Sequence, residues 1–320
     1  MSIGRTEMRV KGKAVWIPSA QIQGRNVIVN GRWLKLAVVQ DEDWIEGETF
    51  SDPASFVSQI KETRLDADLF TFAQKLPNTI PRYSYHLEHD SLAVIPITAY
   101  CEWLEKLAKS DVRSAVKKAA RLGIVTKQVN CDDSLVKGIM AIYNESPFRQ
   151  GKPFWHYNKD FETIKEISST YLDRSTFIGA YYKDELVGFI KMVKVGSVAY
   201  TFHVISMIKH FDKKPTNALI AKAVEICAAN GMSHLVYGNF IYRDAKSSLT
   251  EFKRRNGFQE ALVPRYYVPL TAKGKAVLAM NLHHGIGHVL PQSIWRVLLN
   301  TRAMLWKLRG AGSNQSTIGA

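Results

Sequence analysis

Three apolar segments between residues 176 and 207, TFIGAYYKDELVGFIKMVKVGSVAYTFHVISM, constrain the fold most. Tight turns at residues 183–185 and 195–197 separate the segments, and this spacing predicts an antiparallel meander of three strands. The following segment, PTNALIAKAVEICAANG, predicts a helix with Pro215 at its first position and Gly231 as its stop. We therefore expect strands and helices to be combined in one α/β layer.

The flanking segments extend this pattern. DDSLVKGIMAIYNES, FETIKEISSTYL and SSLTEFKRRNGF predict helices, and HLVYGNFIY predicts a buried strand. Toward the N-terminus, Asn30-Gly31 between two aliphatic runs predicts a hairpin over residues 26–39. DPASFVSQIKETRL predicts a helix that begins at Asp52-Pro53, and DADLFTFAQKLP predicts a buried strand. The predicted fold class is α/β, in the broad sense that includes α+β.

The length of 320 residues favours about two domains in an ordinary globular protein. No apolar run is long enough for a signal peptide or a membrane span, so we expect a cytoplasmic location. Cys101, Cys131 and Cys227 lie far apart and lack ligand spacing, so they indicate structural cysteines, without disulfides or a metal site.

The formal net charge of +14 favours an anionic partner, namely nucleic acid, a phosphorylated cofactor or an acidic membrane surface, although a basic surface also aids solubility. Arg113, Lys117 and Arg121 follow one face of the helix predicted in SDVRSAVKKAARLG. That face is either solvated or in contact with phosphates, for instance those of tRNA. Residues 283–309 form a basic amphipathic pattern, which predicts a helix that packs across the domains or lies on the inner face of a membrane. The final SNQSTIGA is expected to be disordered.

The whole order of elements, which ends in NGFQEALVPRYYVPL, points to a known superfamily. Residues 132–270 resemble the GNAT acyltransferases. FIGAYYKDELVGFIKM resembles the family's second and third strands, and EFKRRNGF resembles its helix followed by Gly-Phe. The preceding LAVIPITAYCEWLEKLAKSDVRSAVKKAARLGI resembles the bridge between the paired domains of Fem-type proteins. The resemblance implies a GNAT-type, mixed and largely antiparallel sheet flanked by helices, repeated in two related domains.

On this resemblance, residues 1–111 form a degenerate acyltransferase-like domain and residues 112–270 a GNAT domain that starts with the basic linking helix. Residues 271–320 form a basic helical tail with a disordered end. Long relatives of this kind include acyl-CoA enzymes and peptidyltransferases that take their amino acid from aminoacyl-tRNA. The leading expectation is an N-acyltransferase that moves an acyl group from acetyl-CoA or another acyl-CoA to a small-molecule or cell-envelope amine, without a metal. The alternative donor is aminoacyl-tRNA.

The resemblance also implies a donor site, because the family's last meander strand diverges from the next strand and the following helix receives a pyrophosphate on its N-terminal N–H groups. The residues that would offer backbone N–H groups are Val204, Ile205, Ser206, Thr216, Asn217 and Ala218. An ordinary core strand explains the first three equally well. The family's Gly-x-Gly loop is absent here and Pro215 removes one donor, so Lys213 and Lys214 would supply positive charge instead.

A second departure concerns the acid that protonates the leaving thiolate. Many family members carry a tyrosine where this chain has Lys253, and a helical lysine is usually exposed. Tyr237, Tyr242 and Tyr266 are the alternative acids. A missing tyrosine favours a leaving group other than a thiolate, and so shifts the balance toward tRNA.

Residues 143–160, YNESPFRQGKPFWHYNKD, gather charged and aromatic side chains in a loop, which predicts the wall of an acceptor site. Glu145 and His156 are the candidate general bases, although a packed ring is the more frequent role of such a histidine. The predicted acceptor contacts are Arg149, Trp155, Tyr157, His203 and Tyr242. In this hypothesis Arg149 holds an acidic or phosphorylated group, and the aromatics exclude water.

A third hypothesis is a catalytically inactive GNAT-type binding module, since the glycines and the tyrosine of the family are missing. No residue pattern identifies the acceptor, which ranges from cell-envelope sugars and peptidoglycan peptides to a protein lysine, or the oligomeric state.

Overall fold

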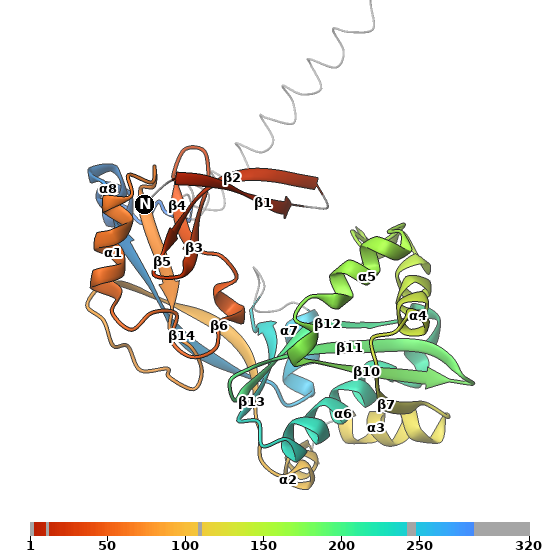
Figure 1. Cartoon of the computed structure of the whole chain (residues 1–320). Coiled ribbons are helices and arrows are strands. Elements are labelled where there is room, and N and C mark those ends of the chain that lie inside the picture. The colour runs from red at the N-terminus through yellow and green to blue at the C-terminus, as the bar shows by residue number, and fades with distance from the viewer. Residues whose placement is uncertain (1–2, 11–12, 108–110, 242–247, 285–320) are drawn as a thin grey trace, which may run out of the picture.

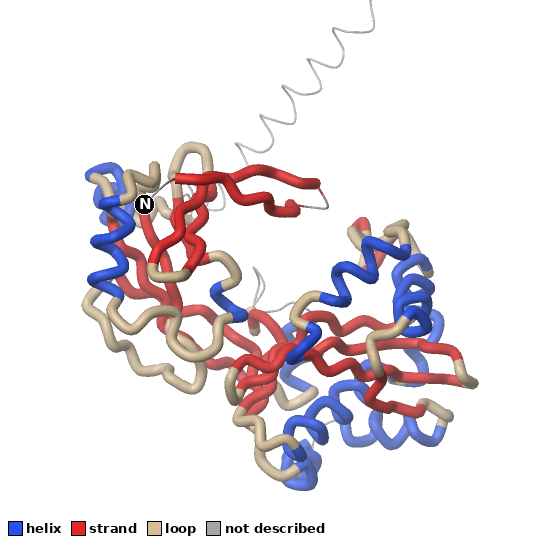
Figure 2. The backbone as a smooth tube through the Cα atoms, in the orientation of Figure 1, coloured by secondary structure: helices blue, strands red, loops and turns tan. Residues whose placement is uncertain are grey.

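The structure, a computed structural model, describes residues 3–10, 13–107, 111–241 and 248–284. Within these residues, a sheet of twelve strands runs through the molecule in the order β1-β2-β3-β4-β5-β14-β6-β13-β12-β11-β10-β7 (Figure 1). Figure 2 shows this sheet between two groups of helices, one at each end. The predicted α/β class with a largely antiparallel sheet is confirmed. None of the helices in the described ranges has the length and apolar character needed to cross a membrane.

The first half of the chain contains six strands and several helices. Its strands are β1 (Ile3–Val10), β2 (Lys13–Ile22), β3 (Arg25–Asn30), β4 (Leu36–Val39), β5 (Leu69–Ala73) and β6 (His86–Pro96). Its helices are the short turn η1 (Glu42–Trp44), α1 (Pro53–Glu62) and α2 (Tyr100–Lys106). The predicted hairpin is present as β3 and β4, but its connection spans residues 31–35, because Gly31 begins a longer loop with φ +98°.

The second half repeats this pattern. Its strands are β7 (Val125–Val129), β8 (Phe148–Arg149), β9 (Lys152–Pro153), β10 (Ser175–Tyr182), β11 (Glu185–Val195), β12 (Val198–Ser206), β13 (His234–Asn239) and β14 (Gln259–Pro269). Its helices are α3 (Asp111–Arg121), α4 (Asp133–Asn144), α5 (Phe161–Ser169), η3 (Leu172–Arg174), η4 (Ile208–Lys213), α6 (Pro215–Ala229), α7 (Ser248–Arg255) and α8 (Ala272–Ala279). The meander predicted for residues 176–207 is confirmed as β10, β11 and β12.

The two halves have the same strand arrangement. In the first, β1 to β4 are antiparallel, and β4 then pairs in parallel with β5. In the second, β7, β10, β11 and β12 are antiparallel, and β12 then pairs in parallel with β13. A helix follows the fourth strand of each half, namely α1 after β4 and α6 after β12. The chain is thus built from two copies of one unit.

The sixth strands of the two halves are exchanged. β6, from the first half, pairs with β13 of the second, and β14, from the second half, pairs with β5 of the first. β6 and β14 also pair with each other along most of their length, so the sheet is continuous at the junction. The predicted boundary at residue 111 therefore divides the sequence, but the sheet continues from one half into the other. The assignment of three domains remains a proposal.

Each half has its own apolar core. Phe56 and Ile60 of α1 pack with Phe70 and Phe72 of β5 in the first half, all nearly inaccessible to solvent. In the second half, the buried face of α6 packs under β10 and β11, as the spacing of its apolar residues predicts. Burial of each such side chain contributes about 2 kcal/mol, so both cores hold their sheets firmly.

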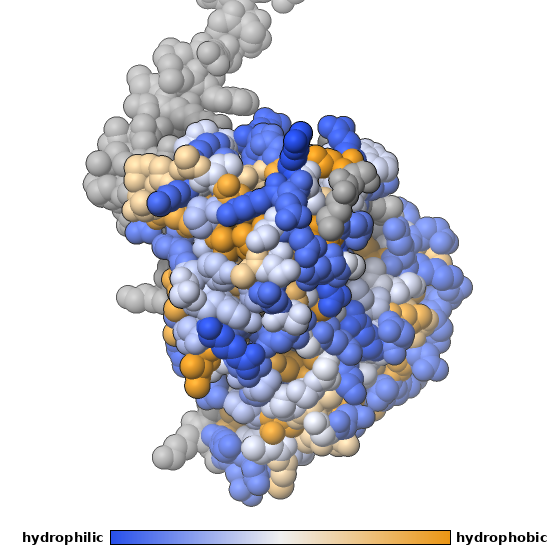
Figure 3. All heavy atoms as spheres, turned by 60° about the vertical axis from the view of Figure 1, so that its left-hand side comes forward, coloured by the Kyte–Doolittle hydropathy of each residue, from blue (hydrophilic) through white to orange (hydrophobic). Residues whose placement is uncertain are grey.

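One face of the molecule can be judged by its hydropathy. Figure 3 shows a mainly hydrophilic face with small hydrophobic areas scattered over it. Of the predicted C-terminal tail, residues 272–279 form α8, whereas residues 285–320, with nearly all of the amphipathic segment, lie outside the described residues.

Candidate functional site at the junction of the two halves

Two neighbouring strands of the second half separate near the middle of the sheet. β12 and β13 pair in parallel only at residues 198–200 and 234–236. Beyond this point β12 stays on β11 as far as Ser206, while β13, which already pairs with β6 at residues 234–236, stays on β6 through an irregularity between Val236 and Asn239. The divergence that the GNAT resemblance implied is therefore present. It leaves a wedge whose apex lies at Tyr200 and Val236.

Helix α6 begins at the open end of this wedge and carries no side-chain cap. Its N-cap residue, Lys214, is exposed and has the left-handed φ of 59°. The side chains of the next turn are engaged, since Thr216 donates to Ser206 Oγ (2.9 Å) and Asn217 donates to Asn256 Oδ1 (3.0 Å). The N–H of Ala218 donates to the carbonyl of Lys214 within the helix, and the predicted Ala218 contact with a ligand remains a prediction. The positive end of the helix dipole faces the wedge, and the acidic residue nearest in sequence, Asp212, pairs with Lys213 and does not cap the helix.

The equivalent helix of the first half is closed. Asp52 precedes α1, and its Oδ1 accepts hydrogen bonds from the N–H groups of Ala54 (2.9 Å) and Ser55 (3.2 Å). A carboxylate of the chain itself therefore occupies the place where an external anion would bind. Of the two related helix starts, α6 is the one that remains available.

A cavity of about 350 Å³ lies at the apex of the wedge. Tyr200 and Thr201 of β12 and Val236, Gly238 and Asn239 of β13 form one wall. The opposite wall comes from the first half and the exchanged strands, through residues 42–44 of η1, residues 73–76 after β5, and side chains of β6 and β14. The cavity thus lies where the two halves meet.

Charged side chains line this cavity, of which Glu42 is buried, Lys75, Asp90 and Arg265 are half-buried and Asp43 is exposed. Arg265 of β14 is bound by Asp90 of β6, with Nη2 2.7 Å from Oδ2, and its Nη1 lies 3.6 Å from Oε2 of Glu42. Glu42 also accepts a hydrogen bond from the N–H of Ala73 (3.1 Å). Lys75 donates to the carbonyls of Glu42 and Ile45. One guanidinium therefore holds two carboxylates in place at the junction.

Burial shifts the pKa values of two of these groups toward 7. It raises the pKa of Glu42 to about 7, against the opposing attraction of Arg265. It lowers the pKa of Lys75 to about 8, although Glu42 and Asp43 favour the charged amine. A carboxyl and an amine that titrate near pH 7 suit the transfer of protons in a cleft.

Comparisons with known proteins agree with this architecture. No protein-family model matches the chain, and no curated protein matches its sequence. Among solved structures, FemX has a TM-score of 0.54 at 10% identity, over 82% of this chain and 87% of FemX. The C-terminal DUF2156 domain of a chain assigned as a lysylphosphatidylglycerol synthetase from Agrobacterium fabrum has a TM-score of 0.53 at 14% identity, over 82% of this chain and 86% of that domain.

A third similar structure is L-PGS from Bacillus licheniformis, with a TM-score of 0.52 at 11% identity, over 78% of this chain and 83% of that protein. All three alignments span both halves of the chain, and at these identities they establish its fold. The chain shares the fold of FemX and of the two lysylphosphatidylglycerol synthetase structures. The expectation drawn from the sequence is confirmed at this level, and the Fem-type arrangement explains why a cavity lies between two related halves.

Lys253 occupies the position at which many GNAT proteins carry a tyrosine, and the expectation that it is exposed is wrong. Its side chain is inaccessible to solvent, and Nζ donates to the carbonyls of Tyr237 (2.7 Å) and Asn239 (2.6 Å). Burial lowers the pKa of Lys253 to about 8. These carbonyls lie at the irregular end of β13, where the wedge opens. The ammonium group of Lys253 is therefore held close to the wedge.

The loop of residues 143–160 does not line the apex cavity. Glu145 instead accepts hydrogen bonds from the N–H groups of Ile208 (2.7 Å) and Lys209 (2.8 Å), and so holds the start of η4. Arg149 donates to the carbonyl of Ser206 (2.8 Å) and contacts Glu145. Both side chains position the connection from β12 to α6. The roles predicted for them, general base and acceptor clamp, remain predictions, and these contacts favour a structural role.

His156 and His203 form a buried aromatic cluster. Their ring centroids are 5.2 Å apart, and Tyr143 lies 4.4 Å from His156. Burial lowers the pKa of His156 to about 3 and that of His203 to about 4, so both rings are neutral at pH 7. His156 is thus a packed ring, the alternative that the sequence left open. Trp155 and Tyr157 of the same loop are largely exposed.

The remaining predicted residues are dispersed. Val204 and Ile205 are half-buried along the wedge, and Lys213 forms an ion pair with Asp212 (3.1 Å). Tyr237 is half-buried beneath Lys253. The reserve acid Tyr266 is fully buried and donates to Gln74, which makes it structural, whereas Tyr242 lies outside the described residues.

Sequence reasoning missed the residues that line the cavity. Glu42 and Asp43 follow β4, which ends at Val39, and acidic residues directly after a buried strand were a usable signal. Asp90 and Arg265 gave no such signal, because they meet only through the exchange of β6 and β14 across 175 positions of sequence.

Proposed function

We propose that this chain is an aminoacyltransferase that takes its acyl group from aminoacyl-tRNA and transfers it to an amine acceptor. The observation that carries this proposal is the carboxylate-lined cavity at the apex of the β12–β13 wedge. In a GNAT fold the acyl end of the donor reaches the point where these strands diverge. The group held there is therefore one that suits Glu42, Asp43 and Asp90.

An aminoacyl group fits such a cavity better than a simple acyl group does. It carries an ammonium next to the reacting carbonyl, and carboxylates in a site of low dielectric attract that charge strongly. An acetyl group offers no charge and would leave Glu42 and Asp90 with only the chain's own cations Arg265 and Lys75 among the described residues lining the apex cavity. The name of the lysylphosphatidylglycerol synthetase domain, one of the similar structures, is that of an enzyme of aminoacyl transfer, which supports the same choice.

The donor's phosphates would bind at α6. This helix start bears Lys213 and Lys214 and lacks a carboxylate cap, whereas the related start of α1 is closed by Asp52. The net charge of +14 favours a large polyanion such as tRNA. A tRNA donor would place the reaction in the cytoplasm.

The chemistry requires proton transfers at both ends. The acceptor nitrogen attacks the ester carbonyl, a carbon–nitrogen bond forms, and the bond between that carbon and the ribose oxygen breaks. Glu42 in its ionised form accepts the proton that the nitrogen loses, and its pKa of about 7 suits that exchange. The ribose oxygen leaves with negative charge and takes up a proton from water, since Lys253 is inaccessible to solvent and does not line the cavity.

An acyl-CoA donor is the second candidate, and one observation favours it. The uncapped start of α6 at the open end of the wedge is where GNAT proteins place the pyrophosphate of coenzyme A. Against it, Pro215 removes one N–H group and no glycine opens the turn, so fewer donors face a pyrophosphate than in the family.

Filter binding with aminoacyl-tRNA, deacylated tRNA and acetyl-CoA tests the proposal. We expect aminoacyl-tRNA to bind most tightly, and Lys213→Glu with Lys214→Glu to weaken it by roughly tenfold or more. Lys61→Glu with Lys106→Glu, two exposed lysines elsewhere, is the charge-matched control. Tight binding of acetyl-CoA alone would select the second candidate, and binding of neither donor would indicate an inactive module.

A further inference from the structure

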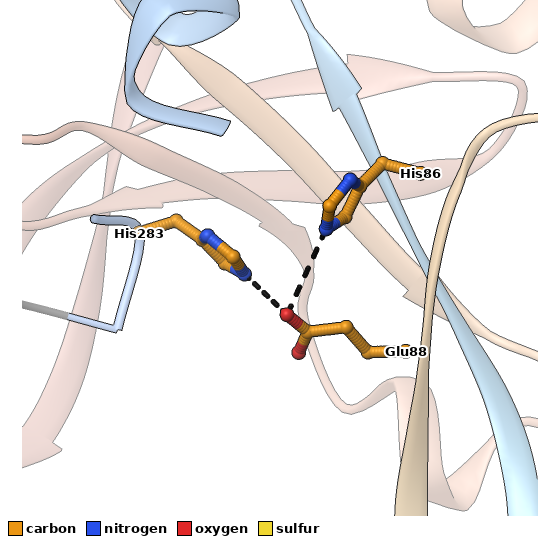
Figure 4. Close-up of side chains that lie close together, drawn as sticks. All are labelled: His86, Glu88 and His283. Atoms are coloured by element: carbon orange, nitrogen blue, oxygen red, sulfur yellow. Dashed lines mark hydrogen bonds and ion pairs between the residues drawn. The ribbon is translucent and has the colours of Figure 1, made fainter. Parts of the chain in front are cut away.

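Histidines from two distant parts of the chain converge on one glutamate. Nε2 of His283 lies 2.5 Å from Oε1 of Glu88, and Nε2 of His284 lies 2.7 Å from Oε2. His86 lies two positions before Glu88 on β6, on the same face of the strand, and its Nε2 is 3.8 Å from Oε1. Figure 4 shows His86 and His283 directed at the same carboxylate oxygen from different elements.

The cluster is more buried than an ordinary surface ion pair. The side chain of His283 is only 1% exposed, and its Nδ1 has no hydrogen-bond partner among the described residues. Its ring lies 4.7 Å from that of Tyr267 and 5.4 Å from that of His86, measured between centroids. Burial of an imidazole costs free energy, which the single contact of Nε2 with Glu88 offsets only in part.

We propose that His86, Glu88 and His283 bind a divalent transition-metal ion, with Zn²⁺ as the best fit and His284 as the fourth ligand. Imidazole nitrogens and a carboxylate oxygen are ligands that zinc prefers. The ligand atoms of the first three residues lie within 4.8 Å of one another. In a tetrahedral zinc site the ligand atoms are roughly 3.3 Å apart, so these three atoms lie near that spacing, while His284, which contacts the other oxygen of Glu88, would have to turn toward the ion.

Four protein ligands make a closed site, which is typical of structural zinc. His86 and Glu88 belong to β6, the exchanged strand between β13 and β14, whereas His283 and His284 follow α8. The ion therefore ties the chain after α8 to the strand that joins the two halves.

A plain hydrogen-bonded cluster is the competing explanation, and it makes the opposite predictions. In such a cluster the two imidazole N–H groups donate to Glu88, and added zinc changes neither stability nor composition. Glu88→Gln then weakens two hydrogen bonds but leaves the metal content of the protein as it was.

The test uses the full chain purified through a tag that contains no histidine. Metal-stripped protein is titrated with ZnCl₂ against a chromophoric chelator, and its melting temperature is followed with and without zinc. We expect about one zinc per chain, a rise in melting temperature of roughly 5 °C at saturation, and intense visible bands with Co²⁺ as a tetrahedral substitute.

The variants assign the ligands. His283→Gln, Glu88→Gln and the less buried His86→Gln should each weaken zinc binding by roughly tenfold or more, whereas the exposed His89→Gln on the same strand should not. Circular dichroism confirms that each variant is folded. The proposal is overturned if wild-type protein shows no stoichiometric binding, or if His89→Gln weakens binding as much as His283→Gln does.

Discussion

Arg265 of β14 holds Asp90 of β6 in an ion pair at the junction of the two halves, with Nη2 2.7 Å from Oδ2. Each residue belongs by sequence to one half and lies in the sheet of the other, because the sixth strands are exchanged. The same guanidinium lies 3.6 Å from Glu42, which follows β4 of the first half. The cavity that we assign to the acyl group is thus built by the exchange, and neither half supplies it alone.

Glu42 should make the folded protein less stable as the pH rises from about 4.5 to 7. Its pKa is raised to about 7 in the folded state, so the folded protein binds more protons than the unfolded chain in this window. The shift corresponds to roughly 3 kcal/mol of unfolding free energy, as an order of magnitude. Urea denaturation at pH 5 and pH 7 measures it. The buried His156 and His203 contribute the opposite pH dependence below pH 6.5, so the test compares variants. Glu42→Gln should differ from wild type in its change of unfolding free energy between pH 5 and pH 7, whereas the exposed Glu62→Gln should match wild type; the same change in all three proteins would contradict the shift.

Arg149→Ala should lower stability more than it changes acceptor binding. Its guanidinium bonds the carbonyls of Ile142 and Ser206 and contacts Glu145, so truncation leaves buried acceptors without a donor. We expect a loss of about 1–3 kcal/mol in unfolding free energy. Chemical denaturation gives this value, with Arg174→Ala as a control. A stable variant with a raised apparent Michaelis constant for the acceptor would instead restore the acceptor-clamp hypothesis.

Lys253→Met should destabilise the protein by about 1–3 kcal/mol, because the carbonyls of Tyr237 and Asn239 lose their common donor. Arg254→Met, at the adjacent exposed position, should change stability by less than about 0.5 kcal/mol. Thermal denaturation at pH 7 compares the two variants. Equal melting temperatures would show that Lys253 does not hold the end of β13.

His156 and His203 should remain neutral well below pH 6.5, since burial lowers the pKa values to about 3 and about 4. The unfolded chain binds more protons than the folded one below pH 6.5, so these rings cause stability to fall as the pH is lowered through that range. NMR titration of the imidazole Cε1–H signals measures both values. A ring that titrates near pH 6.5 would show that the cluster is open to water and would return His156 to the candidate bases.

The sequence predicted the elements much better than the site. The meander of residues 176–207, α6 and the β3–β4 hairpin follow from local patterns, namely apolar periodicity, turn residues and helix stops, and each is present. The loop of residues 143–160 attracted attention because aromatics and charges are unusual in loops. Its Glu145 and Arg149 satisfy backbone groups of η4 and β12, a role that no local pattern shows.

The site itself depends on long-range pairing. Lys253 looked like a surface lysine because its helix carries Arg254 and Arg255 beside it, yet its own side chain points to the end of β13. Asp90 and Arg265 are in contact only because β6 and β14 are exchanged between the halves. The same exchange brings Glu88 of β6 next to His283. Sequence periodicity reports which face of an element is buried, and it cannot report which distant element covers that face.

The most direct test of the central claim is a crystal structure of the protein with a non-hydrolysable aminoacyl-tRNA end, a short CCA oligonucleotide that carries its amino acid through an amide. We predict that a phosphate lies at the start of α6 near Lys213 and Lys214, and that the amino group of the aminoacyl moiety lies in the apex cavity beside Glu42 and Asp90. Density for the analogue along the loop of residues 143–160, with the apex cavity empty, would contradict the account.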